Sequence, residues 1–199
     1  MKKIYFVLLI IFSAHHLVFA QSQAELNQFN TERLLINKKG MCVLGAWGLA
    51  NLAAGATGYA LTGTEVDKNF HQMNMFWGGI NLALATVGYL GSAKDKKEYD
   101  LQQSFKQQQS IEKTFLLNAA LDAVYITAGL YLTERAKNDT KNEARFKGYG
   151  QSIMLQGAFL LVFDAGMYVI ENKHGNKKLN RFLEHVKLSS SGIGVGFKI

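Results

Sequence analysis

Two aspartates stand where an acidic side chain would have unusual chemistry. Asp122 lies in the stretch 114–133 and Asp164 in the stretch 148–170, and neither stretch contains another Asp, Glu, Lys or Arg. A carboxylate in a long apolar helix is costly and is by default a candidate functional group. If the two carboxyl groups face each other, they would share a proton, which is a starting point for proton or cation exchange.

A structural role for the same two acids is the alternative, and the sequence favours it. Asn118 lies one helical turn before Asp122, and Gln156 lies two turns before Asp164, so each acid has an amide on its own face. Protonated or amide-bonded acids would then hold neighbouring helices together. No Arg, Lys or His accompanies either acid in its stretch to complete an ion pathway.

Two asparagines occupy matching places in two earlier uncharged stretches. Asn51 follows Trp47 by four residues, and Asn81 follows Trp77 by four. An amide near the middle of an apolar helix is costly when it faces lipid, so each asparagine is expected to bond to another helix. We therefore predict that both are structural rather than ligand-binding residues.

The elements that must position these residues are long helices. The chain of 199 residues is 48% hydrophobic and has no Pro, which suits uninterrupted helices. About 20 apolar residues cross a bilayer. We predict an all-α transmembrane bundle of two helical hairpins over residues 41–171, with spans at about 41–62, 73–93, 114–133 and 151–170. A soluble bundle is the alternative, but its helices would show a polar face, and these stretches show none.

The first two predicted spans resemble each other in sequence. Residues 47–59 align with residues 77–89 at an offset of 30, and seven of the 13 positions are identical. Inverted repeats of this kind occur in transporters. A duplicated hairpin with shared packing needs is the simpler interpretation. A stripe of small residues in the first span, Ala46, Ala50, Ala54 and Gly58, predicts a helix-packing face.

The N-terminal segment has the features of an export signal. Lys2 and Lys3 precede an apolar run, and Val18-Phe19-Ala20 offers the small residues that a signal peptidase accepts. We predict a signal peptide over residues 1–20, with an uncleaved anchor as the alternative. Residues 21–40 would then form an interfacial lead-in to the first span.

The C-terminal segment, residues 172–199, is predicted to be a basic amphipathic helix followed by a Gly-rich tail. Apolar residues recur at helical spacing from Leu179 to Val186 among basic residues, a pattern typical of helices that lie on anionic headgroups. Residues 192–199 alternate Gly with apolar side chains, which is a strand-like signal. A strand that pairs with a partner and a disordered tail both fit it, and the tail is favoured.

The net charge of +7 is better explained by lipid headgroups than by nucleic acid, because the basic residues flank the predicted spans. Fourteen Lys and Arg residues lie on the side of the mature N-terminus and six on the other side. The positive-inside rule therefore places the N-terminus in the cytoplasm, whereas an export signal places it outside. The two signals predict opposite orientations.

No catalytic motif is recognisable. There is no G-x-S-x-G, Walker loop, H-E-x-x-H or C-x-x-C sequence, and the one cysteine, Cys42, excludes an internal disulfide. His71 and Asn74 lie where the second span begins, and a membrane enzyme could use them, but a lone interfacial His is more often structural. We predict neither an enzyme nor a bound cofactor or metal.

Several residues near the starts of the first two spans resemble a known family. They are Asn37-Lys38-Lys39-Gly40-Met41, Val43-Leu44-Gly45, Trp47, Phe70-His71-Gln72-Met73-Asn74, Trp77 and Asn81. This pattern resembles a domain-of-unknown-function family of small four-helix integral membrane proteins from Gram-negative bacteria, from about Leu26 to the fourth span. The resemblance implies a fold and a location but no activity and no catalytic residue.

The sequence therefore predicts a multi-pass protein of a bacterial membrane, the inner membrane being favoured. Its expected partners are the lipid bilayer and either another membrane protein or a second copy of the chain. A structural or interaction component of a membrane assembly is the preferred function. The alternative is a small proton- or cation-linked transporter that uses Asp122 and Asp164.

Overall fold

The computed structural model describes the backbone of residues 2–189 and 192–195 and the side chains of residues 23–177. Within these ranges the chain forms four helices and two short strands. They are α1 (Lys2–Leu61), α2 (Glu65–Lys94), α3 (Leu101–Ala136), α4 (Glu143–His185), β1 (Val186–Ser189) and β2 (Gly192–Val195). Each predicted span falls within one helix to within one residue, and the chain is all-helical apart from the strands, as expected.

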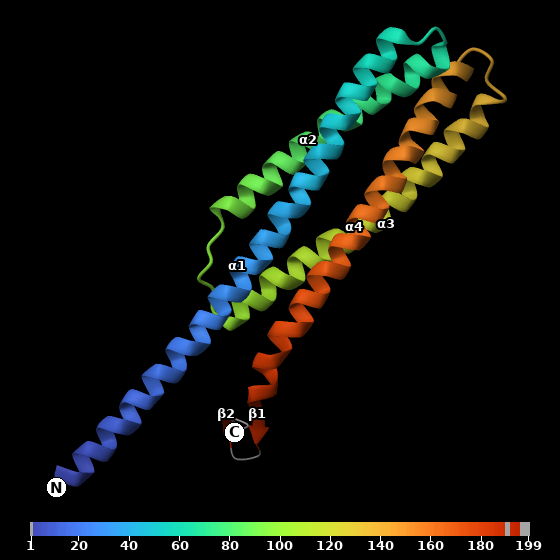
Figure 1. The fold of residues 1–199 in the computed structure, drawn as a ribbon. Coiled ribbons are helices and arrows are strands. Elements are labelled where there is room, and N and C mark those ends of the chain that lie inside the picture. The colour runs from blue at the N-terminus through green and yellow to red at the C-terminus, as the bar shows by residue number, and fades with distance from the viewer. Residues whose placement is uncertain (1, 190–191, 196–199) are drawn as a thin grey trace.

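The four helices form two antiparallel hairpins (Figure 1). Helix α1 packs along α2, and α3 packs along α4. The hairpins join mainly through α2 and α4, with smaller contacts of α1 to α3 and α4. The side between α2 and α3 is therefore the more open one.

Glycines allow the two helices of each hairpin to approach closely. A Cβ atom on Gly48 would lie 2.8 Å from the Gly78 carbonyl oxygen, and one on Gly78 would lie 2.7 Å from the Gly48 oxygen. In the second hairpin, Gly129 and Gly150 face each other in the same way, with both distances 2.6 Å. No side chain fits at these crossings, so each hairpin is held by backbone-to-backbone contact.

The predicted small-residue packing face of α1 is wrong for three of its four residues. Ala46, Ala50 and Ala54 are exposed, whereas Gly48 and Gly55 are buried against α2. Two residues along a helix rotate the side chain by about 200°. The three alanines therefore point away from the partner helix, and only Gly58, at the end of the stripe, packs against His71 of α2.

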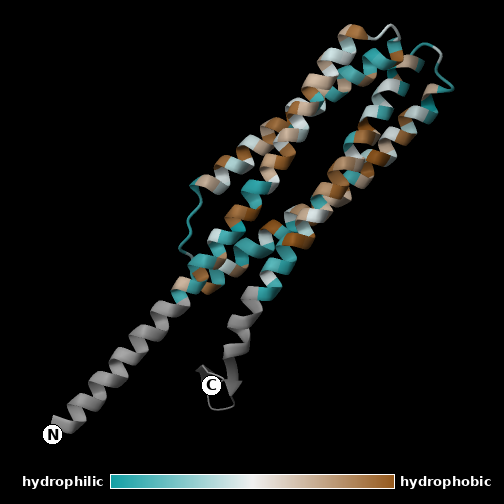
Figure 2. Cartoon of the chain, in the orientation of Figure 1, coloured by the Kyte–Doolittle hydropathy of each residue, from teal (hydrophilic) through white to brown (hydrophobic). Residues whose placement is uncertain are grey.

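The buried side chains of the bundle are more often polar than hydrophobic. Among the described residues, thirteen polar or charged side chains are buried and only nine hydrophobic ones. Large hydrophobic side chains are instead exposed on all four helices, for example Leu49, Val87, Val124 and Val162. Figure 2 shows hydrophobic residues along the middle of the helices and hydrophilic residues toward the loops.

Three of the described helices are long and apolar enough to cross a membrane. They are Gln23–Leu61, Leu101–Ala136 and Glu143–Lys177. Helix α2, which contains the span predicted at 73–93, is not among them. Its Gly residues, Asn74 and Asn81 lower its apolarity, so α2 as a span remains a prediction that depends on its packing against the other helices.

The segments before and after the bundle differ from the expectation. Helix α1 runs without a break through the predicted lead-in, where Leu26, Phe29 and Arg33 are buried inside the bundle. At the other end, β1 and β2 pair antiparallel, with Val186 opposite Val195 and Leu188 opposite Ile193, where a disordered tail was favoured. The sequence alternates apolar residues with Lys, Ser or Gly in both strands, a pattern typical of strands.

Two other predictions concern residues outside the described side chains. The signal peptide at residues 1–20 and the amphipathic face from residue 179 to residue 186 lie there. Both therefore stay predictions, as does the internal repeat.

The glycine crossing in the first hairpin can be tested with adjacent substitutions. Gly78→Ala should destabilise the protein by about 1–3 kcal/mol, because the new methyl group meets backbone atoms that cannot move independently. Gly79→Ala is the control, since nothing lies within 4 Å of its Cβ position. It should be neutral or stabilise by up to about 1 kcal/mol through helix propensity. Thermal unfolding followed by circular dichroism would measure both, and equal midpoints would contradict the close crossing.

Candidate functional site

The side-chain amide of Gln156 on α4 connects both helices of the first hairpin to the second. Its Oε1 accepts from Trp47 Nε1 at 2.8 Å and from Asn81 Nδ2 at 3.4 Å. Its Nε2 donates to Asn51 Oδ1 at 2.7 Å and to Asn74 Oδ1 at 2.9 Å. Gln156 is fully buried, and both lone pairs and both protons of its amide are used.

This group of five residues, which we call the amide hub, contains five of the sequence-predicted site residues. Neighbouring side chains extend it toward the short loops. Ser152 donates to Asn74 at 2.8 Å, and Tyr149 donates to Gln72 at 3.0 Å. Sequence reasoning missed Ser152, although it lies one turn before Gln156 on the same face of α4. The result is a polar seam between α2 and α4.

Asp122 on α3 and Asp164 on α4 form a second polar group. Their carboxyl groups lie next to each other, and Asn118 donates to Asp164 Oδ1 at 3.5 Å. Two carboxyl groups can form a hydrogen bond with each other only when one of them carries a proton. The exposed fractions are 3% for Asp122 and 5% for Asp164, so the sequence-predicted pair is both buried and adjacent.

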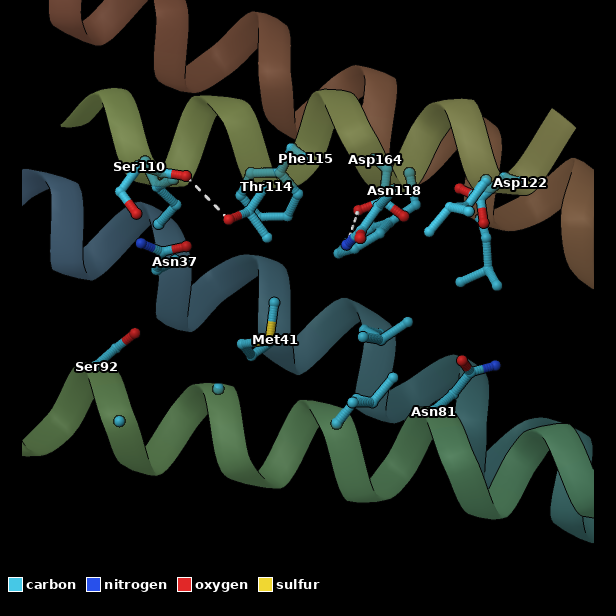
Figure 3. Close-up of a pocket in the computed structure, with 18 of the residues that line it drawn as sticks. Asn37, Met41, Asn81, Ser92, Ser110, Thr114, Phe115, Asn118, Asp122 and Asp164 are labelled. Atoms are coloured by element: carbon cyan, nitrogen blue, oxygen red, sulfur yellow. Dashed lines mark hydrogen bonds between the residues drawn. The ribbon is translucent and has the colours of Figure 1, made fainter. Parts of the chain in front are cut away.

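A cavity of about 550 Å³ lies between the two hairpins, and the carboxyl pair lines one end of it. Figure 3 shows Asn81, Asn118, Asp122 and Asp164 at that end, which we call the deep end. Leu84 on α2 and Leu121 on α3 line the cavity and are also exposed. The cavity therefore opens sideways between α2 and α3.

Aromatic rings surround the deep end. Trp77 on α2 meets Tyr125 on α3 edge to face, with ring centroids 5.1 Å apart. Phe115 on α3 meets Phe163 on α4 in the same way at 6.4 Å. All four rings line the cavity. Trp77, predicted as an interfacial residue, lies here and not in the amide hub.

The opposite end of the cavity is lined by Arg33 and Asp95, which form an ion pair with an N–O distance of 3.6 Å. Tyr99 stands beside them, with its ring 5.9 Å from the Arg33 guanidinium and its hydroxyl donating to Asp95 at 2.5 Å. The Asp95 carboxylate raises the pKa of the Tyr99 hydroxyl, because it accepts the proton that the hydroxyl would lose.

A third polar cluster, beyond the Arg33 end, was not predicted. Asn30 donates to Ser104 at 2.9 Å, and Gln108 donates to the backbone oxygen of Glu171 at 2.7 Å. All four side chains are buried between α1, α3 and α4. The signal that could have found them is the recurrence of Asn30, Arg33 and Asn37 at helical spacing on the face that also carries Leu26 and Phe29.

His71 lies apart from these groups, near the turn between α1 and α2. Its ring packs against Phe70 and over Gly58, where an added Cβ would overlap it. This is the environment of a packed side chain rather than of a group that faces a cavity. Among the described residues, no three His, Cys, Asp or Glu side chains come together as metal ligands.

Fold and site together define a four-helix protein with a polar interior, an apolar exterior and a lateral cavity. The family of unknown function DUF6992 matches residues 43–165, which is more than half of the chain. The chain belongs to this family. The matched region contains the amide hub, the carboxyl pair and most of the cavity, whereas Arg33 lies before it. No curated protein and no solved structure matches the chain.

The amide hub predicts a large effect of one substitution. Gln156→Leu keeps a similar size but leaves buried groups of Trp47, Asn51 and Asn81 with fewer partners. Each buried group left unpaired costs about 1–3 kcal/mol, so a clear fall in the thermal unfolding midpoint is expected. Gln109→Leu, at an exposed position of α3, should change stability by no more than about 0.5 kcal/mol. Similar midpoints for the two variants would show that the hub is dispensable.

Proposed function

We propose that this chain is a multi-pass integral protein of a bacterial inner membrane that serves as a structural or interaction component of a membrane assembly. The observation that carries the proposal is the inverted polarity of the bundle. Polar side chains fill the interior, and large hydrophobic side chains face outward. Water would penalise that arrangement, whereas a lipid environment favours it.

The exposed hydrophobic side chains form a belt of limited height around the bundle, as expected for a surface that contacts lipid. Apart from Leu35, they occur within residues 43–61, 76–90, 116–131 and 155–170, close to the predicted spans. Helix α3 has 36 residues and is therefore about 54 Å long, whereas the hydrocarbon core is about 30 Å thick. The surplus length, with the cluster around Gln108 and Glu171, would project beyond the bilayer on one side.

An interaction role is supported by the absence of a recognisable catalytic constellation at the buried polar groups within residues 23–177. The amide hub is saturated by its own hydrogen bonds, so its amides are used to hold helices together. The outer surface remains apolar on every helix. Such a surface can contact lipid, a second copy or another membrane protein.

A photo-crosslinking amino acid placed at one outward position of each helix tests this role. Suitable sites are Leu49, Val87, Val124 and Val162, which are all exposed. In the native membrane, we expect lipid adducts from most sites and a protein adduct of one defined mass from at least one site. The adduct mass distinguishes a second copy from another protein.

Two outcomes would contradict the proposal in different ways. Lipid adducts alone at all four sites would show an isolated subunit. The lack of lipid adducts at every site would argue against membrane insertion. A crosslinker at Asn138, in the exposed loop between α3 and α4, provides the control position outside the belt.

A small proton- or cation-linked transporter is the second candidate. The observation that favours it is the contact between the Asp122 and Asp164 carboxyl groups on the cavity wall. A shared proton in an apolar setting can be exchanged for a cation. The narrow bundle encloses little volume, so transport would require several copies or a rearrangement of the hairpins.

Transport can be tested in proteoliposomes with a trapped pH-sensitive dye. Under an imposed Na⁺ or K⁺ gradient, Asp122→Asn and Asp164→Asn should each abolish proton exchange while circular dichroism shows an intact helical fold. Glu98→Gln removes an exposed carboxylate outside the cavity and should leave the exchange unchanged. Unchanged exchange in the two aspartate variants would eliminate this candidate.

A further inference from the structure

The deep end of the cavity holds two carboxyl groups and no basic side chain beside them. Asp122 and Asp164 are both buried there, and the Oδ2 atom of Asp122 has no hydrogen-bond partner. Of the described residues that line the cavity, Arg33 is the only basic one, and it is paired with Asp95. A cation at this end of the cavity would therefore meet two carboxyl groups and no competing basic side chain among the described lining residues.

The separation of the two ends prevents Arg33 from neutralising the carboxyl pair. Asn81 lies at the level of Asp122 in Figure 3, and Asp95 follows Asn81 by fourteen residues along α2. At 1.5 Å per residue, the two ends are about 20 Å apart. Charges at this distance interact weakly compared with charges in contact.

The wall around the carboxyl pair combines the amides of Asn81 and Asn118 with aromatic and aliphatic side chains. Trp77 and Tyr125 lie on one side of Asp122 along the helices, and Phe115 and Phe163 lie on the other. Aromatic rings attract cations through their π faces, and they also provide apolar surface. Acidic groups within an aromatic wall are the combination that recognises organic ammonium-type cations.

A bare metal ion fits this cavity less well. Hard cations need several oxygen ligands at about 2–2.6 Å, and the ion itself occupies only a small part of a 550 Å³ cavity. Among the described residues, no third acidic, His or Cys side chain joins the two carboxyl groups as a metal ligand. The size and the apolar wall therefore favour a ligand with its own hydrophobic groups.

The geometry points to a binding site for a lipophilic organic monocation, with the charged centre beside Asp122 and Asp164 and the apolar groups against the four rings. The ligand would enter from the bilayer between α2 and α3, past Leu84 and Leu121. This inference goes beyond the proposed structural or interaction role, since binding requires neither an assembly nor transport.

Binding can be measured by equilibrium dialysis of the full chain in non-ionic detergent, with protein-free micelles as the blank. The probe is tetraphenylphosphonium, and tetraphenylborate, which has the same shape and the opposite charge, is the matched control. We expect saturable binding of the phosphonium and none of the borate. The double variant Asp122→Asn/Asp164→Asn should weaken phosphonium binding at least tenfold, whereas Glu98→Gln should leave it unchanged.

Several outcomes would overturn the inference. They are equal binding of both ions, absence of saturable phosphonium binding, retention of full affinity in the double variant, and displacement of the phosphonium by excess NaCl. If the double variant does not fold, the comparison of the two ions on the unchanged protein still shows whether the site prefers a cation or an anion. Phe163→Leu then tests the wall and should weaken binding by about three- to tenfold.

Discussion

The arrangement of the four helices depends on hydrogen-bond partners for the polar side chains that are buried in the bundle. Gln156 provides such partners for three helices at once, because its amide bonds to Trp47, Asn51, Asn74 and Asn81. In lipid there is little hydrophobic driving force between helices, so interhelical hydrogen bonds and close packing determine where helices meet. The amide hub thus fixes α4 against the first hairpin.

The position of the hub has a consequence for the opposite side of the bundle. Since α2 is held against α4 by a polar seam, it leaves α3 at a distance, and the cavity opens between these two helices. The glycine crossings bring the two helices of each hairpin into backbone contact. The two hairpins meet along the α2–α4 seam and through smaller contacts of α1 with α3 and α4.

The three buried polar groups differ in whether they leave a hydrogen-bonding atom without a partner on the cavity wall. In the amide hub, the central amide uses all its hydrogen-bonding capacity, which is typical of a structural element. The cluster around Gln108 and Glu171 connects α3 to α4 beyond the apolar belt. The carboxyl pair alone combines burial, an unpartnered oxygen and a position on a cavity wall. For this reason it is the candidate for chemistry that the other two groups lack.

The amino-acid sequence by itself determined the helical class, the approximate helix positions and the polar residues of the amide hub and the carboxyl pair. The reason is that charge-free stretches and isolated polar residues are local signals, visible without knowledge of neighbours. Even so, the local pattern failed for the Ala46 stripe, because small side chains permit a contact without specifying which face makes it.

Tertiary structure alone decided which polar residues meet. Asn51, Asn74 and Gln156 are distant in sequence, and no periodicity within one helix shows that another helix will bring a matching amide to the same depth. The same holds for the contact of Asp122 with Asp164, for the burial of Arg33 and for the lateral cavity. These features follow from the glycine crossings within each hairpin and from the packing of the two hairpins along one seam, which no single segment determines.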